Sequence, residues 1–181
     1  MEQTAIDSEA KNSQETDAKS RKSDKAADNQ QAVKKQYLTF KMGDDEFGVD
    51  ILSVQEIHGW IEPRPMPDTP PYIRGVIDWR ETVVPIIDLR IRFAYDSVTY
   101  DKSTVVIILK SELQGVDHPF ILGIVVDAVS DVHDVEKKSM REAPRLGGKI
   151  DTKYIKGIAK VHGEMIILLE LNKLFKLEEF E

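Results

Sequence analysis

Short runs in which apolar and polar residues alternate make up most of the chain from Gln36 onward. The segment from Tyr37 to Met42 alternates as a half-buried strand does, and Gly43 to Glu46 supplies turn residues before the apolar run at Phe47. This pattern predicts a hairpin. Further strands are predicted by Val- and Ile-rich runs at 82–89, 103–109 and 120–126. The apolar core is predicted to include Ile51, Leu52, Val54 and Ile57.

Helical periodicity is clear only near the end of the chain. Residues 171–180 place Leu171 and Leu174 on one face, which predicts a helix. Pro85 lies within a predicted strand, and because proline lacks an amide hydrogen we expect it at a sheet edge or bulge. Predicted strands outnumber helices, so the fold is expected to be mainly β.

The chain also contains an internal repeat. Residues 72–89 align without gaps on 154–171, with identical Tyr, Ile, Gly and final Leu at matching positions. An earlier segment, 48–57, aligns on 123–132, and the difference between the two offsets places seven extra residues in a loop near 142–148. We therefore predict two related lobes, each a small barrel of about five strands. Chance similarity between apolar strands is the alternative.

Residues 1–35 differ sharply in composition from the rest. They contain no Leu, Phe, Tyr or Trp, and their seven basic side chains balance seven acidic ones. Such a segment buries too little apolar surface to offset the entropy lost on ordering, so we predict a disordered tail followed by a folded domain at 36–178. A tether or charged docking arm is the functional alternative for the tail.

Charge and composition narrow the possible partners. The net charge is −7, and the acidic excess lies in 36–181, so no nucleic-acid partner is expected, because an acidic domain repels phosphate. There are no cysteines, which excludes disulfides and thiolate sites. The longest apolar runs are much shorter than the roughly 20 residues that span a bilayer. With no signal peptide evident either, we expect no membrane insertion and a cytoplasmic location.

Motifs for catalysis or metal binding do not occur. The sequence has no HExxH, GxSxG or P-loop pattern, and no two histidines have the spacing of a helical metal pair. The histidines are His58, His118, His133 and His162. Acidic residues lie at the ends of four apolar runs, namely Asp50, Asp88, Asp127 and Asp131. One interpretation is that two of them form a catalytic carboxylate pair. The alternative is that they are solvated at strand ends and turns. We expect no catalytic residue, no metal and no cofactor.

Trp79 and Arg80 lie in a predicted turn just before the strand at 82–89. Aromatic and arginine side chains are enriched at the hot spots of protein interfaces, so the pair is a candidate anchor for a partner. The residues alone are equally compatible with Trp79 capping a lobe core while Arg80 is solvated.

Several strings together resemble the CheW family of chemotaxis coupling proteins over about 36–178. They are Tyr37-Leu38-Thr39-Phe40, Gly43 to Leu52, Val54-Gln55-Glu56-Ile57, Tyr72 to Ile77, Val84 to Arg90, Thr104 to Ile107, Gly123 to Val132 and Tyr154 to Ile158. The resemblance implies two SH3-like five-stranded β-barrel lobes packed around a shared apolar groove, with a C-terminal helix. It also implies a non-catalytic scaffold that couples chemoreceptor cytoplasmic tips to the regulatory domain of a CheA-type histidine kinase. Through these partners the chain would associate with membrane-bound receptor arrays.

The family's receptor contacts carry over to six positions: Val54, Gly75, Arg80, Gly123, Val129 and Val132. The glycines would let a receptor helix approach the backbone, the valines would form an apolar floor, and the arginine would fix the register. Kinase contacts are expected at the strand ends of the lobes, without assignment to individual residues.

The predicted turn departs from the family's usual Gly-Val-Ile-Asn-Leu-Arg-Gly at Asp78, Trp79 and Glu81. Trp79 and Glu81 are therefore candidate interface variants, and we hypothesise that they serve a variant receptor set. Pairing of Glu81 with Arg80, which would weaken receptor binding, is the alternative. For the whole chain, the alternative function is a kinase-tuning module of a variant chemosensory system that binds receptors only weakly.

Overall fold

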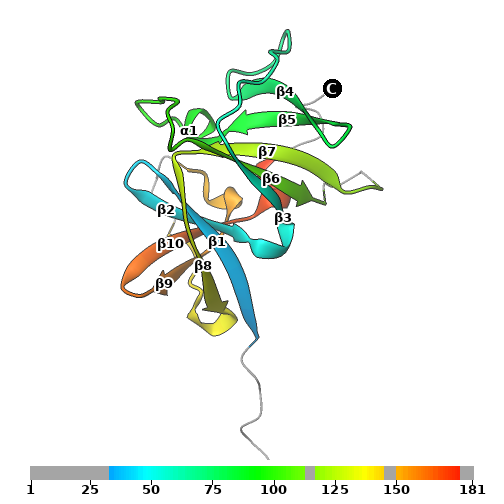
Figure 1. Cartoon of the computed structure of the whole chain (residues 1–181). Coiled ribbons are helices and arrows are strands. Elements are labelled where there is room, and N and C mark those ends of the chain that lie inside the picture. The colour runs from blue at the N-terminus through cyan, green and yellow to red at the C-terminus, as the bar shows by residue number, and fades with distance from the viewer. Residues whose placement is uncertain (1–32, 113–116, 145–149, 176–181) are drawn as a thin grey trace, which may run out of the picture. The chain divides into compact units, whose positions relative to one another are not determined.

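The computed structural model describes residues 33–112, 117–144 and 150–175, in which strands predominate. These residues form two five-stranded sheets, which we call lobe A and lobe B (Figure 1). Lobe A has the strand order β8–β1–β2–β10–β9 and comprises β1 (Lys34–Met42), β2 (Asp45–Asp50), β8 (Ala128–Glu136), β9 (Ile155–Val161) and β10 (Glu164–Leu169). Lobe B has the order β3–β6–β7–β5–β4 and comprises β3 (Val54–Gly59), β4 (Ile73–Trp79), β5 (Thr82–Asp88), β6 (Val105–Ser111) and β7 (Phe120–Val126). The predicted mainly β fold of two five-stranded units is confirmed.

The two lobes have the same strand plan. In each, an antiparallel pair (β1–β2 or β6–β7) joins a hairpin (β9–β10 or β4–β5) through a parallel contact. The hairpins begin at Ile73 and Ile155, which are matching positions of the sequence alignment. Each half also exchanges a strand: β3 follows β2 but pairs with β6, and β8 follows β7 but pairs with β1.

Buried apolar side chains in the described part of the chain fall into three clusters. The largest contains residues of both lobes, among them Phe47 of β2 and Ile107 of β6, so the lobes share a core. Two smaller clusters belong to lobe A (with Tyr37) and lobe B (with Ile108). Neighbouring residues of β6 thus face different clusters. A strand buried on both faces reads as a continuous apolar run, which is the pattern seen in the sequence at 105–109.

Two core predictions are wrong. Leu52 is 82% exposed and Ile57 is 44% exposed. The reason for the first is a 3-10 turn, η1 (Ile51–Ser53), which interrupts the strand alternation, with the Asp50 side chain accepting a hydrogen bond from the Leu52 amide at 3.0 Å. Two further 3-10 turns are η2 (Lys137–Ser139) and η3 (Thr152–Tyr154).

The helix predicted over 171–180 is wrong in extent. Helix α2 (Leu171–Leu174) is a single turn, and Phe175 has an extended backbone with φ −128° and ψ 142°. Helix α1 (Leu89–Arg92), at the matching position of the repeat, was not predicted. The rest of the predicted helix, the tail at 1–32 and part of the 142–148 loop lie outside the described residues.

Two local features follow from strand pairing. Strand β1 begins at Lys34, two residues before the predicted domain start, because Lys34 and Lys35 pair with the end of β8. Pro85 lies in β5, an inner strand, yet β5 pairs with β7 only from Ile86 onward. The proline therefore has a strand neighbour on one side alone. That neighbour, Val76, exchanges its backbone hydrogen bonds with Arg64, so the missing amide hydrogen of Pro85 costs no bond to β4.

Candidate functional site

The predicted apolar receptor contacts lie on the two exchanged strands. Val54 begins β3 and Val129 lies on β8, at matching positions of the repeat, and both are half-buried against the shared core. Val132, also on β8, is 41% exposed. Strands β3 and β8 are edge strands of their sheets, so these valines lie where a partner can reach them.

The two predicted glycine contacts are buried, and the chain itself fills the space beside them. A Cβ on Gly75 would lie 2.0 Å from the Arg64 carbonyl oxygen, and Gly75 has φ +130°, which few other residues adopt. A Cβ on Gly123 would lie 2.5 Å from Cδ1 of Ile86. The close backbone approach expected of a receptor helix is therefore made within the chain, which explains both glycines without a partner.

Arg80 projects from the β4–β5 turn and reaches the opposite edge of lobe B. Its Nη2 donates to Oε2 of Glu56 on β3 at 2.9 Å, and Nε1 of Trp79 donates to the same oxygen at 2.8 Å. The guanidinium lies 4.7 Å from the Trp79 ring centre, within the range of a cation–π contact. His58 Nε2 lies 2.9 Å from Oε1 of Glu56, close enough for an ion pair but not aligned for a hydrogen bond. We call Glu56, His58, Trp79 and Arg80 the lobe B seam.

These contacts answer the question that the sequence left open at this turn. Trp79 is half-buried against the lobe B cluster, as expected of a residue that caps the core, and its ring also contacts Arg80, as expected of an interface anchor. Arg80 remains 69% exposed and pairs with Glu56 rather than with Glu81. The hydrogen bond from Trp79, opposed by desolvation and supported by the charges of His58 and Arg80, lowers the pKa of Glu56. The carboxylate is therefore ionised at neutral pH and orients the guanidinium.

The turn itself has an unusual backbone. Arg80 and Glu81 have φ values of +50° and +64°, the left-handed region on both central residues of a two-residue hairpin turn. Such turns favour Gly, Asn or Asp. A glycine at position 81 would suit this conformation, whereas Glu81 strains it.

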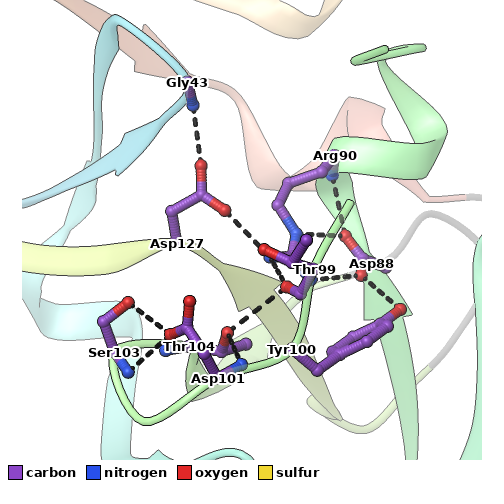
Figure 2. Close-up of polar contacts among 9 residues, drawn as sticks. All are labelled: Gly43, Asp88, Arg90, Thr99, Tyr100, Asp101, Ser103, Thr104 and Asp127. Carbon is purple, nitrogen blue, oxygen red and sulfur yellow. Dashed lines mark hydrogen bonds and ion pairs between the residues drawn. The ribbon is translucent and has the colours of Figure 1, made fainter. Parts of the chain in front are cut away.

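A second polar cluster, centred on Arg90, links the lobes (Figure 2). The Arg90 side chain is 1% exposed and bonds both oxygens of buried Asp88 at 2.8 and 3.0 Å and Oδ1 of Asp127 at 2.8 Å. Asp127 Oδ2 also accepts a hydrogen bond from the Gly43 amide in the β1–β2 turn at 2.7 Å. Tyr100 Oη donates to Asp88 at 2.8 Å.

The Arg90 cluster fits neither interpretation of Asp88 and Asp127, because Asp88 is buried and both carboxylates bind a cation. Burial lowers the pKa of Arg90, but hydrogen bonds and charge from Asp88 and Asp127 raise it by more, so a cation holds the two carboxylates. Through Asp127, these contacts connect α1 to the β1–β2 turn. Because both carboxylates are paired with Arg90, neither is free to act as an acid or a base. Asp50 and Asp131 instead cap the amides of Leu52 and Val132.

Elsewhere, the described residues contain no group of three or more His, Cys, Asp or Glu placed to hold a metal ion. Neither α-helix in the described ranges is long enough to span a bilayer, since α1 and α2 are single turns. A hollow of about 550 Å³ lies between β6 and lobe A. Its lining mixes leucines with charged side chains: Leu52, Leu169, Leu171, Lys35, Asp50, Lys110, Glu112, Lys156 and Glu170. None of the six predicted receptor contacts lines this hollow, so it is not the predicted apolar groove.

Two five-stranded lobes that exchange a strand and share a core define a two-lobed, mainly β domain. The chain belongs to the CheW-like domain family, whose model matches residues 36–179. It is 40% identical to Chemotaxis protein CheW of Klebsiella aerogenes, over 82% of this chain and 86% of that protein. It is 33% identical to Chemotaxis protein CheW of Rhizobium meliloti, over 81% and 91%. The crystal structure of scaffolding protein TtCheW from Thermoanaerobacter tengcongensis matches with a TM-score of 0.71 at 30% identity, covering 83% of this chain and 94% of that one.

Proposed function

We propose that this chain is a non-catalytic, cytoplasmic scaffold of chemotaxis that links the cytoplasmic tip of a chemoreceptor to the regulatory domain of a CheA-type histidine kinase. Membership of the CheW-like family supports this proposal, as does similarity to proteins named for chemotaxis and to one described as a scaffolding protein. The Arg90 cluster supports the non-catalytic part, since its acids are held by a buried cation.

The lobe B seam is the observation that carries the receptor contact. An arginine on a flexible loop would lose much side-chain entropy on binding, whereas Arg80 is already positioned by Glu56 and by the Trp79 ring. Its exposed guanidinium keeps donors for an acidic or carbonyl group of a partner helix. Val54, two residues before Glu56 on the same strand, supplies adjacent apolar surface.

The proposal that the chain binds a kinase is supported by its membership of the CheW-like family and by its two-lobed fold. The second partner is proposed to bind strand ends of the lobes, away from the lobe B seam. A scaffold with separate surfaces can hold both partners at once, which is the property that distinguishes it from a competitor for one of them.

A three-component capture experiment tests the function. A receptor cytoplasmic fragment is immobilised, and the kinase is added with and without the full-length chain. The proposal predicts that the kinase is retained only when the chain is present, and that the chain binds each partner alone. A chain that binds the kinase but fails to bind the receptor would instead be a kinase-tuning module, and a chain that binds neither partner would refute the proposal.

A further inference from the structure

Lobe A has a seam that matches the lobe B seam position by position. The alignment of 72–89 on 154–171 places His162 on Arg80, and extending that of 48–57 on 123–132 by one residue places His133 on His58. His133 lies on β8, one edge strand of lobe A, and His162 lies in the turn that follows β9, the other edge strand. The backbone agrees as well, since φ is +50° at both Arg80 and His162.

The side-chain contacts across the lobe A seam differ from those in lobe B. Asp131 occupies the position of Glu56, but its Oδ1 accepts a hydrogen bond from the Val132 amide at 2.7 Å. Val161 occupies the position of Trp79 and has no donor. His162 instead faces His133, with ring centres 5.6 Å apart and ring planes inclined by 65°.

We propose that His133 and His162 form a binding site for one divalent transition-metal ion of the zinc, nickel or copper type. Imidazole is a preferred ligand of these ions. Two imidazoles that share an ion at about 2.1 Å from each nitrogen have ring centres roughly 5 Å apart. The observed 5.6 Å is close to that separation, so small side-chain rotations bring one nitrogen of each ring onto a common ion.

The backbone holds the two ligands in place while leaving the site open. His133 pairs with Tyr37 of β1 and is half-buried, whereas His162 is exposed. Because the described residues supply no third His, Asp or Glu ligand, the remaining coordination positions are open to water or to a partner side chain. A bound ion joins the two edges of lobe A, as Arg80 and Glu56 join those of lobe B.

The test uses the untagged full-length chain and the metal salts alone. Titration with Zn²⁺, Ni²⁺ and Cu²⁺ by calorimetry is expected to show saturable binding of one equivalent, with a rise in the melting temperature, because a ligand that binds the folded state stabilises it. His133→Ala and His162→Ala should each weaken metal binding about tenfold or more. Loss of a residue that only supports a ligand already costs about tenfold in metal affinity, and loss of a ligand should cost at least as much. His58→Ala is the matched control at the equivalent position in lobe B and should bind as the wild type does.

Three results would overturn the proposal. They are the absence of saturable binding, wild-type affinity in His162→Ala, and an equal loss in His58→Ala. Should His133→Ala fold poorly, the exposed His162 variant decides alone. Binding that leaves the melting temperature unchanged also contradicts an ion placed across the seam.

Discussion

Replacing Glu81 with glycine should stabilise the folded chain, because Glu81 holds a backbone conformation that suits glycine. Its φ is +64° and its side chain is exposed. A left-handed conformation costs a non-glycine residue about 1–2 kcal/mol, whereas glycine loses about 0.5–1 kcal/mol more through backbone entropy on folding. The expected net gain is about 0.5–1 kcal/mol, which raises the melting temperature by roughly 1–4 °C in a chain of this size.

Equilibrium unfolding in urea measures this gain as a higher midpoint with an unchanged slope. The reverse control is Gly163→Glu at the equivalent turn position of lobe A. There φ is +90° and no atom lies within 4 Å of a Cβ position, so only the backbone cost is added, and the chain should lose at least about 0.5–1 kcal/mol. A neutral or destabilised Glu81→Gly beside a destabilised Gly163→Glu would refute the strain argument and show that the Glu81 carboxylate makes a stabilising contact.

The same variant tests the hypothesis that Glu81 serves a variant receptor set. If Glu81 contributes to recognition, Glu81→Gly should bind the chain's own receptor no more tightly than the wild type. A rise in affinity would contradict the hypothesis and favour the alternative, in which Glu81 weakens receptor binding.

Two further predictions concern the interior and the lobe B seam. Gly123→Ala should destabilise the chain by about 1–3 kcal/mol, because the new Cβ meets Cδ1 of Ile86 in a buried strand. Adding Ile86→Val, which removes that atom, should recover part of the loss, and strict additivity in urea unfolding would contradict the clash. Glu56→Gln should lower the free energy of unfolding at pH 7, since the Trp79 hydrogen bond lowers the pKa of Glu56 below its ordinary value of 4.5. The stabilisation by the ionised Glu56 carboxylate is fully present above pH 4.5 and is lost as the pH falls through the lowered pKa. The free energies of unfolding of wild type and variant should therefore converge in acid. A difference that stays constant with pH would contradict stabilisation by the ionised carboxylate.

Periodicity in the sequence was sufficient for most of the fold, because a strand buried on one or both faces leaves a local pattern. The strand at Phe120–Val126 has the predicted bounds, and the aligned hairpins begin at matching residues. Local pattern failed at Leu52, where a side-chain cap from Asp50 starts a 3-10 turn. It also failed at α1, a single turn too short for helical periodicity to show.

The site was less predictable because its contacts join residues that are distant in sequence. Residue type and family resemblance indicate Arg80, but they give no sign of its partner Glu56, which comes from the opposite edge of the sheet. The burial of Arg90 was missed, since a charged residue is expected at the surface unless its partners are known, and Asp127 lies 37 residues away. The chain's own contacts to Gly75 and Gly123 were equally invisible in the sequence.

The central claim, that the chain binds a receptor through the lobe B seam while another surface binds the kinase, is tested most directly with Arg80→Ala. Affinities of the full-length variant for a receptor fragment and for the kinase are measured separately. Lys138→Ala is the matched control, because Lys138 is an exposed cation that pairs with a glutamate, as Arg80 does. The account predicts a weaker receptor complex with unchanged kinase binding for Arg80→Ala, and unchanged receptor binding for the control. Equal loss of both partners, or undiminished receptor binding, would contradict it.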